Sequence, residues 1–475
     1  MNTQWNFDNT YIKLPAIFFT KQLPTPVSNP KPVIFNERLA STLDIPFDLS
    51  VFAGNKIPSG ANSISQSYAG HQFGYFTKLG DGRAVLLGEI ITAQNKRLDI
   101  QLKGSGKTPY SRGGDGRAAL GPMLREYLIS EAMFSLGVPT TQSLAVVETG
   151  ESVIRDRLLR GAVLTRVADS HIRVGTFEYA ARFGQREDLK ALADYSIKRH
   201  YGCIANHENR YFLFLKQVIK RQAELIAKWQ LIGFIHGVMN TDNMAISGET
   251  IDYGPCAFMD EYDQNTVFSS IDRGARYSFK SQPKMAAWNL ARFAESLLPL
   301  FDDGDMAIKL LEKEIDGFQP LFQRYLLDGM RKKLGLFDKE EGDELLVNEL
   351  LELMQKHKAD YTNTFKALTL GESDGLALFA AQEFSYWDIA YRARLNRQDK
   401  SKYEIQNLMK SSNPAIIPRN FIVEKVLEDA ENGDISGFNE FMSALKSPYA
   451  YLADHKKYCD LKPSASCSYQ TFCGT

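Results

Sequence analysis

Two blocks of this chain carry residue types that bind phosphate and metal ions. Residues 101–117 are rich in glycine, lysine and arginine, and residues 236–254 hold Asp242, Asn243 and Asp252. Glycines let backbone N–H groups approach an anion, and lysine and arginine neutralise its charge. Carboxylate and amide oxygens are ligands that Mg²⁺ prefers. The two blocks therefore predict the two halves of a nucleoside triphosphate site.

The bulk composition is that of an ordinary globular protein. The 475 residues are 44% hydrophobic and 24% charged, with a formal net charge of −1. Such a chain has no overall basic field to attract nucleic acid or an anionic membrane. Any phosphate site must come from a local cluster of cations, and no nucleic-acid partner is expected.

The sequence also lacks the usual signs of membrane insertion or secretion. No apolar run reaches the roughly 18 residues of a membrane span, and the first thirty residues lack the apolar core of a signal peptide. The five cysteines do not form a secreted disulfide pattern, and the three near the end do not have the spacing of a zinc site. We expect a cytoplasmic protein without a membrane partner.

The first part of the chain is patterned for strands. Residues 75–79 and 84–91 flank Gly80-Asp81-Gly82-Arg83, which predicts a β-hairpin closed by an Asp-Gly turn. Residues 98–103 and 153–166 predict further strands. Pro122 is suited to open a helix that ends before Gly137. The pentapeptide Gly-Asp-Gly-Arg-Ala recurs at 114–118, so Asp115 and Gly116 repeat the turn.

The second part is patterned for helices. The pattern becomes helical after Phe177, residues 212–235 form an amphipathic candidate that leads into His236, and 288–298 and 344–356 predict further helices. We expect an α+β protein with three segments. An N-terminal extension (1–60) packs on the core, a β-rich lobe (61–180) binds phosphate, and a helical lobe (181–475) carries the catalytic and metal loops.

The order of these parts resembles the protein-kinase fold. A glycine-rich hairpin, a strand lysine, a helix glutamate and a catalytic loop precede Asp252-Tyr253-Gly254, where kinases have Asp-Phe-Gly. The segments YAGHQFG (68–74), QLKGSG (101–106) and HGVMNTDN (236–243) resemble the selenoprotein O family, from about residue 60 to the C terminus. That resemblance implies a two-lobed kinase-like fold and a protein adenylyltransferase, although the family was long classed with pseudokinases.

Lys103 and Glu126 are candidates for the ion pair that fixes a phosphate-binding lysine. Lys103 ends a strand, and Glu126 lies 23 residues later on the next helix. Spacing alone leaves open a surface lysine and an exposed acid, whereas the resemblance favours the pair. Lys107 is the competing lysine, but it lies in the glycine-rich segment.

Asn243 and Asp252 are the candidate ligands for Mg²⁺ or Mn²⁺. Phosphate oxygens and water would complete the coordination shell of the ion. Either residue alone could simply initiate a turn. The catalytic base departs from the kinase pattern, because Val238 stands where kinases have aspartate. The resemblance implies that Asp242 accepts the proton instead, with metal binding by Asp242 as the alternative.

The cationic side chains near the glycine-rich block bear on which phosphate of the nucleotide is attacked. Arg83, Arg166 and Arg173 join Lys103 as candidate phosphate ligands, since arginine grips phosphate oxygens in a fork. The resemblance implies that ATP binds inverted relative to kinases, so that AMP is transferred and pyrophosphate leaves. Residues expected to bind the nucleotide are Gly80, Gly82, Arg83, Lys103, Asp115, Gly116, Glu126, Arg166, Arg173 and Asp252. The other arginines, including Arg112, Arg117 and Arg125, are expected in surface ion pairs.

Histidines and cysteines suggest supporting roles. His71 and His236 are expected to pack or brace loops rather than catalyse. Some relatives carry selenocysteine near the C terminus, where this chain has Cys473. A disulfide between Cys473 and Cys256 would constrain the metal loop, whereas two reduced thiols are the ordinary alternative in the cytosol.

The sequence therefore predicts a monomeric enzyme that moves AMP from ATP to Ser, Thr or Tyr hydroxyls of other proteins, and to itself. Two alternatives stay open. An ordinary phosphotransferase would need a base at position 238, where the chain has Val238. A nucleotide-binding scaffold would not need Lys103, Glu126, Asn243 and Asp252 together.

Overall fold

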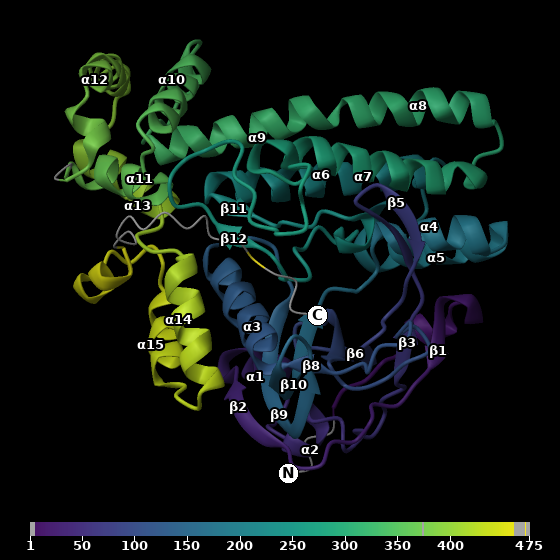
Figure 1. Ribbon diagram of the computed structural model, residues 1–475. Coiled ribbons are helices and arrows are strands. Elements are labelled where there is room, and N and C mark those ends of the chain that lie inside the picture. The colour runs from purple at the N-terminus through teal and green to yellow at the C-terminus, as the bar shows by residue number, and fades with distance from the viewer. Residues whose placement is uncertain (1–4, 373–374, 460–470, 472–475) are drawn as a thin grey trace.

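A strand-rich part and a helical part lie against each other in the computed structural model (Figure 1). The structure describes residues 5–372, 375–459 and 471. Most of the strands and the first helices form the lower part in Figure 1, and most of the later helices fill the upper part. This arrangement confirms the predicted α+β class, with a β-rich N-terminal lobe followed by a mainly helical one.

The N-terminal part is built on one antiparallel sheet with the strand order β1-β3-β6-β7-β10-β9-β2, and β8 pairs with β10. Its strands are β1 (Phe19–Lys21), β2 (Lys31–Phe35), β3 (Ile64–Gln66), β6 (Ala84–Ile91), β7 (Arg97–Lys103), β8 (Ala118–Ala119), β9 (Gln142–Ile154) and β10 (Leu158–Ala168). The first sixty residues supply both edge strands and the helices α1 (Glu37–Leu43) and α2 (Leu49–Phe52). The proposed boundaries at 60 and 180 stay a prediction.

Helix α3 (Leu120–Ser135) packs against β9 and β10. Almost every residue of α3 is buried, Glu126 among them, because the sheet covers one face of the helix and later helices cover another. Gly137 follows the helix with φ +75°, a left-handed conformation that glycine adopts without strain. The predicted helix after Pro122 is thus confirmed, although it begins two residues earlier.

The predicted hairpin around Gly80–Arg83 is wrong. Strand β5 (Tyr75–Lys78) pairs with β4 (Ala69–Gln72) in a separate two-stranded sheet, and β6 pairs with β3 and β7. The turn of the real hairpin is Phe73-Gly74, with φ +51° and +91°, the pair of positive φ angles of a two-residue type I′ turn. Residues 80–83 instead lead from the hairpin back to the main sheet.

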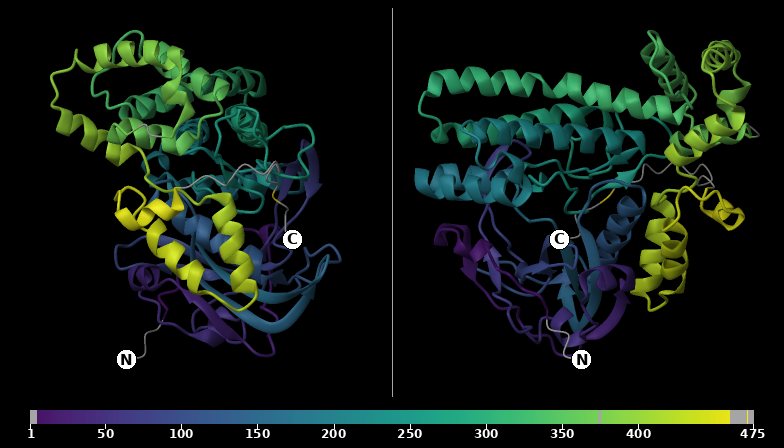
Figure 2. Two further views of the ribbon diagram at one scale, coloured as in Figure 1. Left: turned by 60° about the vertical axis from the view of Figure 1, so that its left-hand side comes forward. Right: turned by 180° about the vertical axis from the view of Figure 1, so that it is seen from behind.

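Six helices make the body of the second part: α4 (Val174–Phe183), α5 (Arg186–His200), α6 (Arg210–Leu231), α7 (Gln282–Leu297), α8 (Gly304–Asp316) and α9 (Phe318–Lys333). Helices α6, α7, α8 and α9 run side by side across the top (Figures 1 and 2). The loop after α6 holds β11 (Phe234–Ile235), the short turn η4 (Thr241–Asn243) and β12 (Ala257–Phe258). That loop faces the main sheet.

A further group of helices extends from one end of the body: α10 (Asp343–Lys356), α11 (Tyr361–Leu370), α12 (Gln382–Leu395) and α13 (Lys402–Ser412). Helices α14 (Asn420–Glu431) and α15 (Ser436–Leu445) then return to α3 (Figure 2). The aromatic rings of Phe438 and Tyr127 lie 6.4 Å apart at this contact. Within the described residues, no helix is both long and apolar enough to cross a membrane.

Candidate active site

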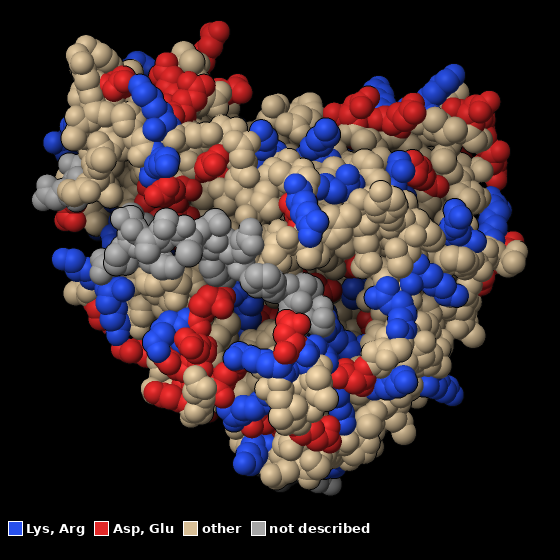
Figure 3. All heavy atoms as spheres, in the orientation of Figure 1, with Lys and Arg blue, Asp and Glu red and all other residues tan. Residues whose placement is uncertain are grey.

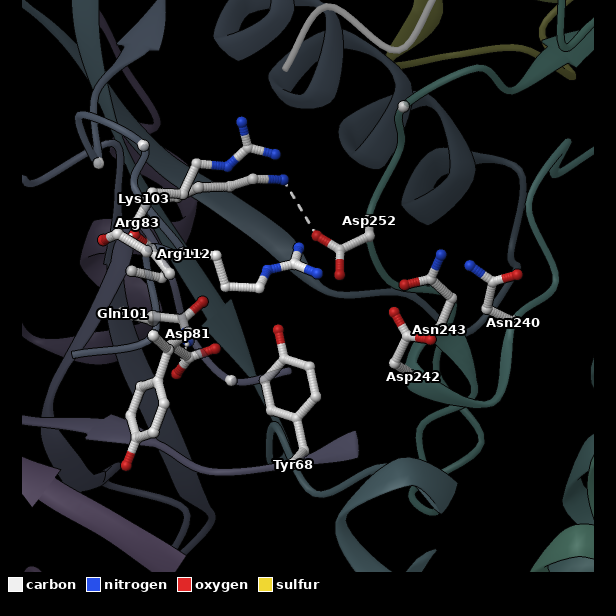
Figure 4. A pocket seen from close by; sticks show the side chains of 18 of the residues that line it. Tyr68, Asp81, Arg83, Gln101, Lys103, Arg112, Asn240, Asp242, Asn243 and Asp252 are labelled. Carbon is white, nitrogen blue, oxygen red and sulfur yellow. Dashed lines mark hydrogen bonds and ion pairs between the residues drawn. The ribbon is translucent and has the colours of Figure 1, made fainter. Parts of the chain in front are cut away.

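A cavity of about 630 Å³ lies where the main sheet meets the loop after α6 (Figure 4). Both blocks singled out in the sequence line it. The predicted residues on its wall are Gly80, Gly82, Arg83, Lys103, Asp115, Gly116, Arg166, Arg173, Asp242, Asn243 and Asp252. Only Glu126 of the predicted set is absent from the wall, because it lies behind Lys103.

Lys103 at the end of β7 is held by Glu126 of α3. Its Nζ donates to Glu126 Oε2 at 2.6 Å, and Arg166 Nε donates to Glu126 Oε1 at 2.8 Å. Glu126 is 2% exposed. Burial raises the pKa of this carboxyl, but Arg166 and Lys103 outweigh burial and hold it below its usual value. Lys103 and Glu126 are therefore a buried pair, unlike the exposed alternative.

Asp252 receives three cations from the sheet side of the cavity. Lys103 Nζ lies 3.0 Å and Arg166 Nη2 2.5 Å from its Oδ1, and Arg173 Nη1 lies 3.5 Å from Oδ2. Burial opposes ionisation, yet Arg166, Lys103 and Arg173 hold the pKa of Asp252 well below its usual range. Asp252 is therefore ionised at neutral pH and shares its charge among these three cations.

Two arginines on the sheet side of the cavity keep their charge available. Arg83 and Arg112 line it (Figure 4), and neither forms an ion pair with a described residue. Gly116 on the same wall has φ +70°, and a Cβ there would come within 2.2 Å of the Gly106 backbone. Only glycine fits this close approach of two loops.

Asp242 lies on the helical side of the cavity, in the turn η4. It is 7% exposed, and its Oδ1 has no hydrogen-bond partner among the described residues. Burial is the main cause that raises its pKa to about 6, and the charge of Arg173 only partly offsets it. A carboxyl group with this pKa can accept a proton near neutral pH.

Asn243 can present an oxygen to the cavity. Its Nδ2 donates to the Val238 carbonyl at 3.0 Å, which leaves Oδ1 directed to the cavity (Figure 4). The described residues contain no cluster of three His, Cys, Asp or Glu side chains suited to a metal. The oxygens of Asn243 and Asp252 nevertheless fit a Mg²⁺ or Mn²⁺ ion whose other ligands are phosphate oxygens and water.

The expectation that Arg112, Arg117 and Arg125 form ion pairs at the surface is wrong for Arg112 and Arg125. Arg112 lines the cavity. Arg125 is buried in α3, donates from Nη2 to the Cys256 carbonyl at 2.7 Å, and reaches Glu424 of α14 with Nη1 at 2.7 Å. Arg117 does pair with Glu151. Arg125 therefore ties α3 to the metal loop and to the returning helices.

Several lining residues were missed by sequence reasoning. They are Tyr68, Gln72, Asp81, Gln101, Tyr110, Arg155 and Asn240. Gln101 could have been found, since it lies two residues before Lys103 on the same face of β7. Asp81 receives N–H groups from the backbone of Gln66 and the side chain of Gln101, both at 3.2 Å, so its role is to order the loop before Arg83.

The two histidines have structural surroundings. His236 is buried, its Nε2 donates to the Ile251 carbonyl at 2.9 Å, and burial lowers its pKa. It ties the start of the loop that carries Asp242 to the backbone next to Asp252. His71 forms a short contact with Glu178 and stacks edge-on against Trp288.

Cys256 is a buried thiol next to the metal loop, and burial raises its pKa to about 11. Cys473 lies outside the described residues. Thr471, two residues before it, donates from Oγ1 to the Pro255 carbonyl at 2.7 Å. The predicted disulfide between Cys256 and Cys473 stays a prediction.

The fold and the cavity define an α+β protein with a cavity, lined by cations, where its main sheet meets its helical part. The family model described as "Protein adenylyltransferase SelO" matches residues 3–446. The chain belongs to this SelO family.

Curated relatives called "Protein nucleotidyltransferase YdiU" support the same assignment. The one from Geobacillus kaustophilus is 57% identical over 100% of both chains. The one from Clostridium beijerinckii is 59% identical over 100% of this chain and 98% of its own, and the one from Bacillus cereus 58% over 100% and 99%.

Among solved structures, ROP2 from Toxoplasma gondii matches with 11% identity and a TM-score of 0.26, over 77% of this chain and 93% of its own. Its title describes a virulence factor with a protein-kinase fold and no enzymatic activity.

Proposed function

We propose that this protein transfers AMP from ATP to Ser, Thr or Tyr hydroxyl groups of proteins and releases pyrophosphate. The family assignment gives the reaction class. The observation that carries the proposal is the division of the cavity wall into two sides. The sheet side holds Lys103, Arg166, Arg83 and Arg112, of which the last two form no ion pair with a described residue, and the helical side holds Asp242. The sheet side suits a pyrophosphate leaving group, and the helical side suits an incoming alcohol.

Each residue then has a defined task. Lys103 and the arginines bind the terminal phosphates and stabilise the charge that develops on pyrophosphate. The acceptor oxygen attacks the α-phosphorus, the bond from that phosphorus to the bridging oxygen breaks, and pyrophosphate leaves with the electron pair. Asp242, which lines the cavity, takes the proton of the acceptor hydroxyl at its carboxylate. Val238 supplies no competing base at the kinase position.

The metal ion belongs to this proposal as well. Asn243 and Asp252 would hold Mg²⁺ or Mn²⁺. When bound, the ion supplies positive charge that neutralises phosphate oxygens. Lys103 and Arg166 contact Asp252 directly, so these cations keep that carboxylate ionised and in place.

Regulation by oxidation is a finer proposal for the same protein. Cys256 adjoins the loop of Asp252, so a disulfide to Cys473 would restrict that loop. Peptide mapping without reductant tests it, because free thiols at both positions under oxidising conditions would remove the idea. The monomeric state, self-modification and the cytoplasmic location stay predictions.

Labelled ATP tests the reaction directly. The protein is incubated with candidate acceptor proteins and ATP labelled at the α- or the γ-phosphate. Label from the α position alone supports AMP transfer. Label from the γ position alone would instead establish a phosphotransferase, and no label from either position would leave the nucleotide-binding scaffold.

A further inference from the structure

The β4–β5 hairpin lies directly beside the proposed base. The His71 N–H donates to Thr241 Oγ1 at 2.7 Å, and the Phe73 N–H donates to Asn240 Oδ1 at 3.1 Å. Both acceptors lie directly before Asp242 in the chain. The hairpin is thus fastened along β4 to the loop that carries the base, and Gln72 at its end lines the cavity.

The outer edge of β5 is open. His71 pairs in register with Phe76, and Ala69 with Lys78. Because the His71 N–H points away from β5, these are the non-hydrogen-bonded pairs, so the N–H and C=O groups of Phe76 and Lys78 point outward. Among the described residues β5 pairs only with β4. Tyr75, at the start of this edge, is 79% exposed.

Cations without acidic partners surround this edge. Lys78 lies over the ring of Phe183 at 5.1 Å, Arg182 over Phe76 at 5.1 Å, and Arg276 over Trp288 at 4.9 Å. None of these three cations forms an ion pair with a residue that the structure describes. Lys and Arg side chains gather around the position of β5 on the right of Figure 3.

The acidic side chains nearby are already engaged. Glu178 of α4 is buried against His71, and Glu295 of α7 pairs with Arg292. Asp272 accepts the backbone N–H groups of Arg276 and Tyr277. The surface formed by β5, the end of α4 and the segment before α7 therefore offers Lys78, Arg182 and Arg276 as cations without an acidic partner among the described residues.

We propose that the acceptor polypeptide docks along the outer edge of β5 as an extended segment that carries acidic side chains. This inference rests on the proposed function and names its acceptor. Backbone groups of the segment would pair with the outward groups of Phe76 and Lys78. Its acidic side chains would meet Lys78, Arg182 and Arg276, and its hydroxyl residue would enter the cavity beside Asp242. Main-chain pairing is independent of sequence, so the cations provide the selection.

Two synthetic peptides test the docking: one carries a single serine flanked by glutamates, and the other has glutamines in their place. We expect the wild-type protein to transfer label from α-labelled ATP to the acidic peptide with the lower KM. The double variant Lys78→Glu/Arg182→Glu should raise the KM for the acidic peptide about tenfold or more. The KM for ATP and the melting temperature should stay unchanged, because both side chains are exposed.

Lys446→Glu is the matched control, since Lys446 is exposed at the end of α15, far from β5 along the chain, and forms no ion pair with a described residue. It should leave both peptide KM values unchanged. Equal KM values for the two peptides, an unchanged KM in the double variant, or a wild-type protein that labels itself but neither peptide would each overturn the docking surface. No label from α-labelled ATP on any acceptor would instead overturn the proposed function.

The pairing edge has its own test. Lys78→Pro removes an outward N–H of β5, whereas Lys78→Ala removes only the charge. We expect Lys78→Pro to raise the peptide KM several-fold above that of Lys78→Ala, with the KM for ATP equal in both. Equal peptide KM values in the two variants would show that the segment does not pair with β5.

Discussion

At the scale of single residues, Asp242 combines burial with a carboxyl oxygen, Oδ1, that has no hydrogen-bond partner among the described residues. Its pKa of about 6 lets it act as a base only when ionised. We expect kcat/KM for AMP transfer to fall tenfold per pH unit below about pH 6. Asp242→Asn should lower transfer by 10²-fold or more and abolish this limb. A pH profile of label transfer measures both, and a variant that keeps the wild-type profile would exclude Asp242 as the base.

The same carboxyl group also links stability to pH. In the unfolded chain its pKa returns to the ordinary value of about 3.9. Between about pH 4 and pH 6 the folded protein therefore binds more protons than the unfolded chain. The stability that protonated Asp242 contributes is complete below about pH 4 and is lost as the pH rises through 6. Asp242→Asn should be more stable than wild type at pH 7.5, by up to about 3 kcal/mol, and no more stable at pH 4. Urea denaturation at the two pH values measures the difference.

Asp252 tests the metal at the same scale. Asp252→Ala should abolish transfer at ordinary Mg²⁺ concentrations, because one ligand is lost and Lys103, Arg166 and Arg173 lose their shared carboxylate. Asp399→Ala, at an exposed aspartate after α12, is the matched control. A Mg²⁺ titration of label transfer is the measurement, and wild-type turnover in Asp252→Ala would exclude Asp252 as an essential ligand.

At the scale of elements, Gly70 of β4 packs against Asp242, the proposed base. A Cβ on Gly70 would come within 2.2 Å of Asp242 Oδ1 and 2.8 Å of its Cβ. Gly70→Ala should therefore displace Asp242 and lower kcat by roughly 10²-fold, as ångström-scale misplacement of a catalytic group does. Gly304→Ala has open space and should leave kcat unchanged. Label transfer at saturating ATP compares the two, and equal rates would show that β4 does not set the position of Asp242.

A comparison of single elements shows which features of the fold and site the sequence could predict and which it could not. Lys103, Glu126 and Asp252 were predicted because each belongs to a local pattern and their order along the chain is distinctive. The turn at Phe73-Gly74 was missed because it depends on tertiary contacts. A phenylalanine at φ +51° is held there by Asn240 and by Tyr277, whose ring lies 5.1 Å from that of Phe73. Local turn signals at Gly80–Arg83 could not reveal those contacts.

At the scale of the whole molecule, the last helices support the active site from behind. Arg125 of α3 pairs with Glu424 of α14 and also holds the backbone of the metal loop. Phe438 of α15 is fully buried against Tyr127, which is the neighbour of Glu126. Helices α14 and α15 thus pack against α3 and hold in place the helix whose Glu126 binds Lys103.

Phe438→Ala tests the packing of α15 against α3. Loss of a fully buried phenylalanine should lower the free energy of unfolding by about 3–5 kcal/mol. Because the void left by the missing ring would lie under α3, we also expect the KM for ATP to rise at temperatures where the variant remains folded. Leu345→Ala is the control, since Leu345 is 62% exposed on α10 and should change stability by less than about 0.5 kcal/mol. If urea denaturation and the KM for ATP are unchanged in Phe438→Ala, then α14 and α15 are a peripheral attachment and α3 is held by the sheet alone.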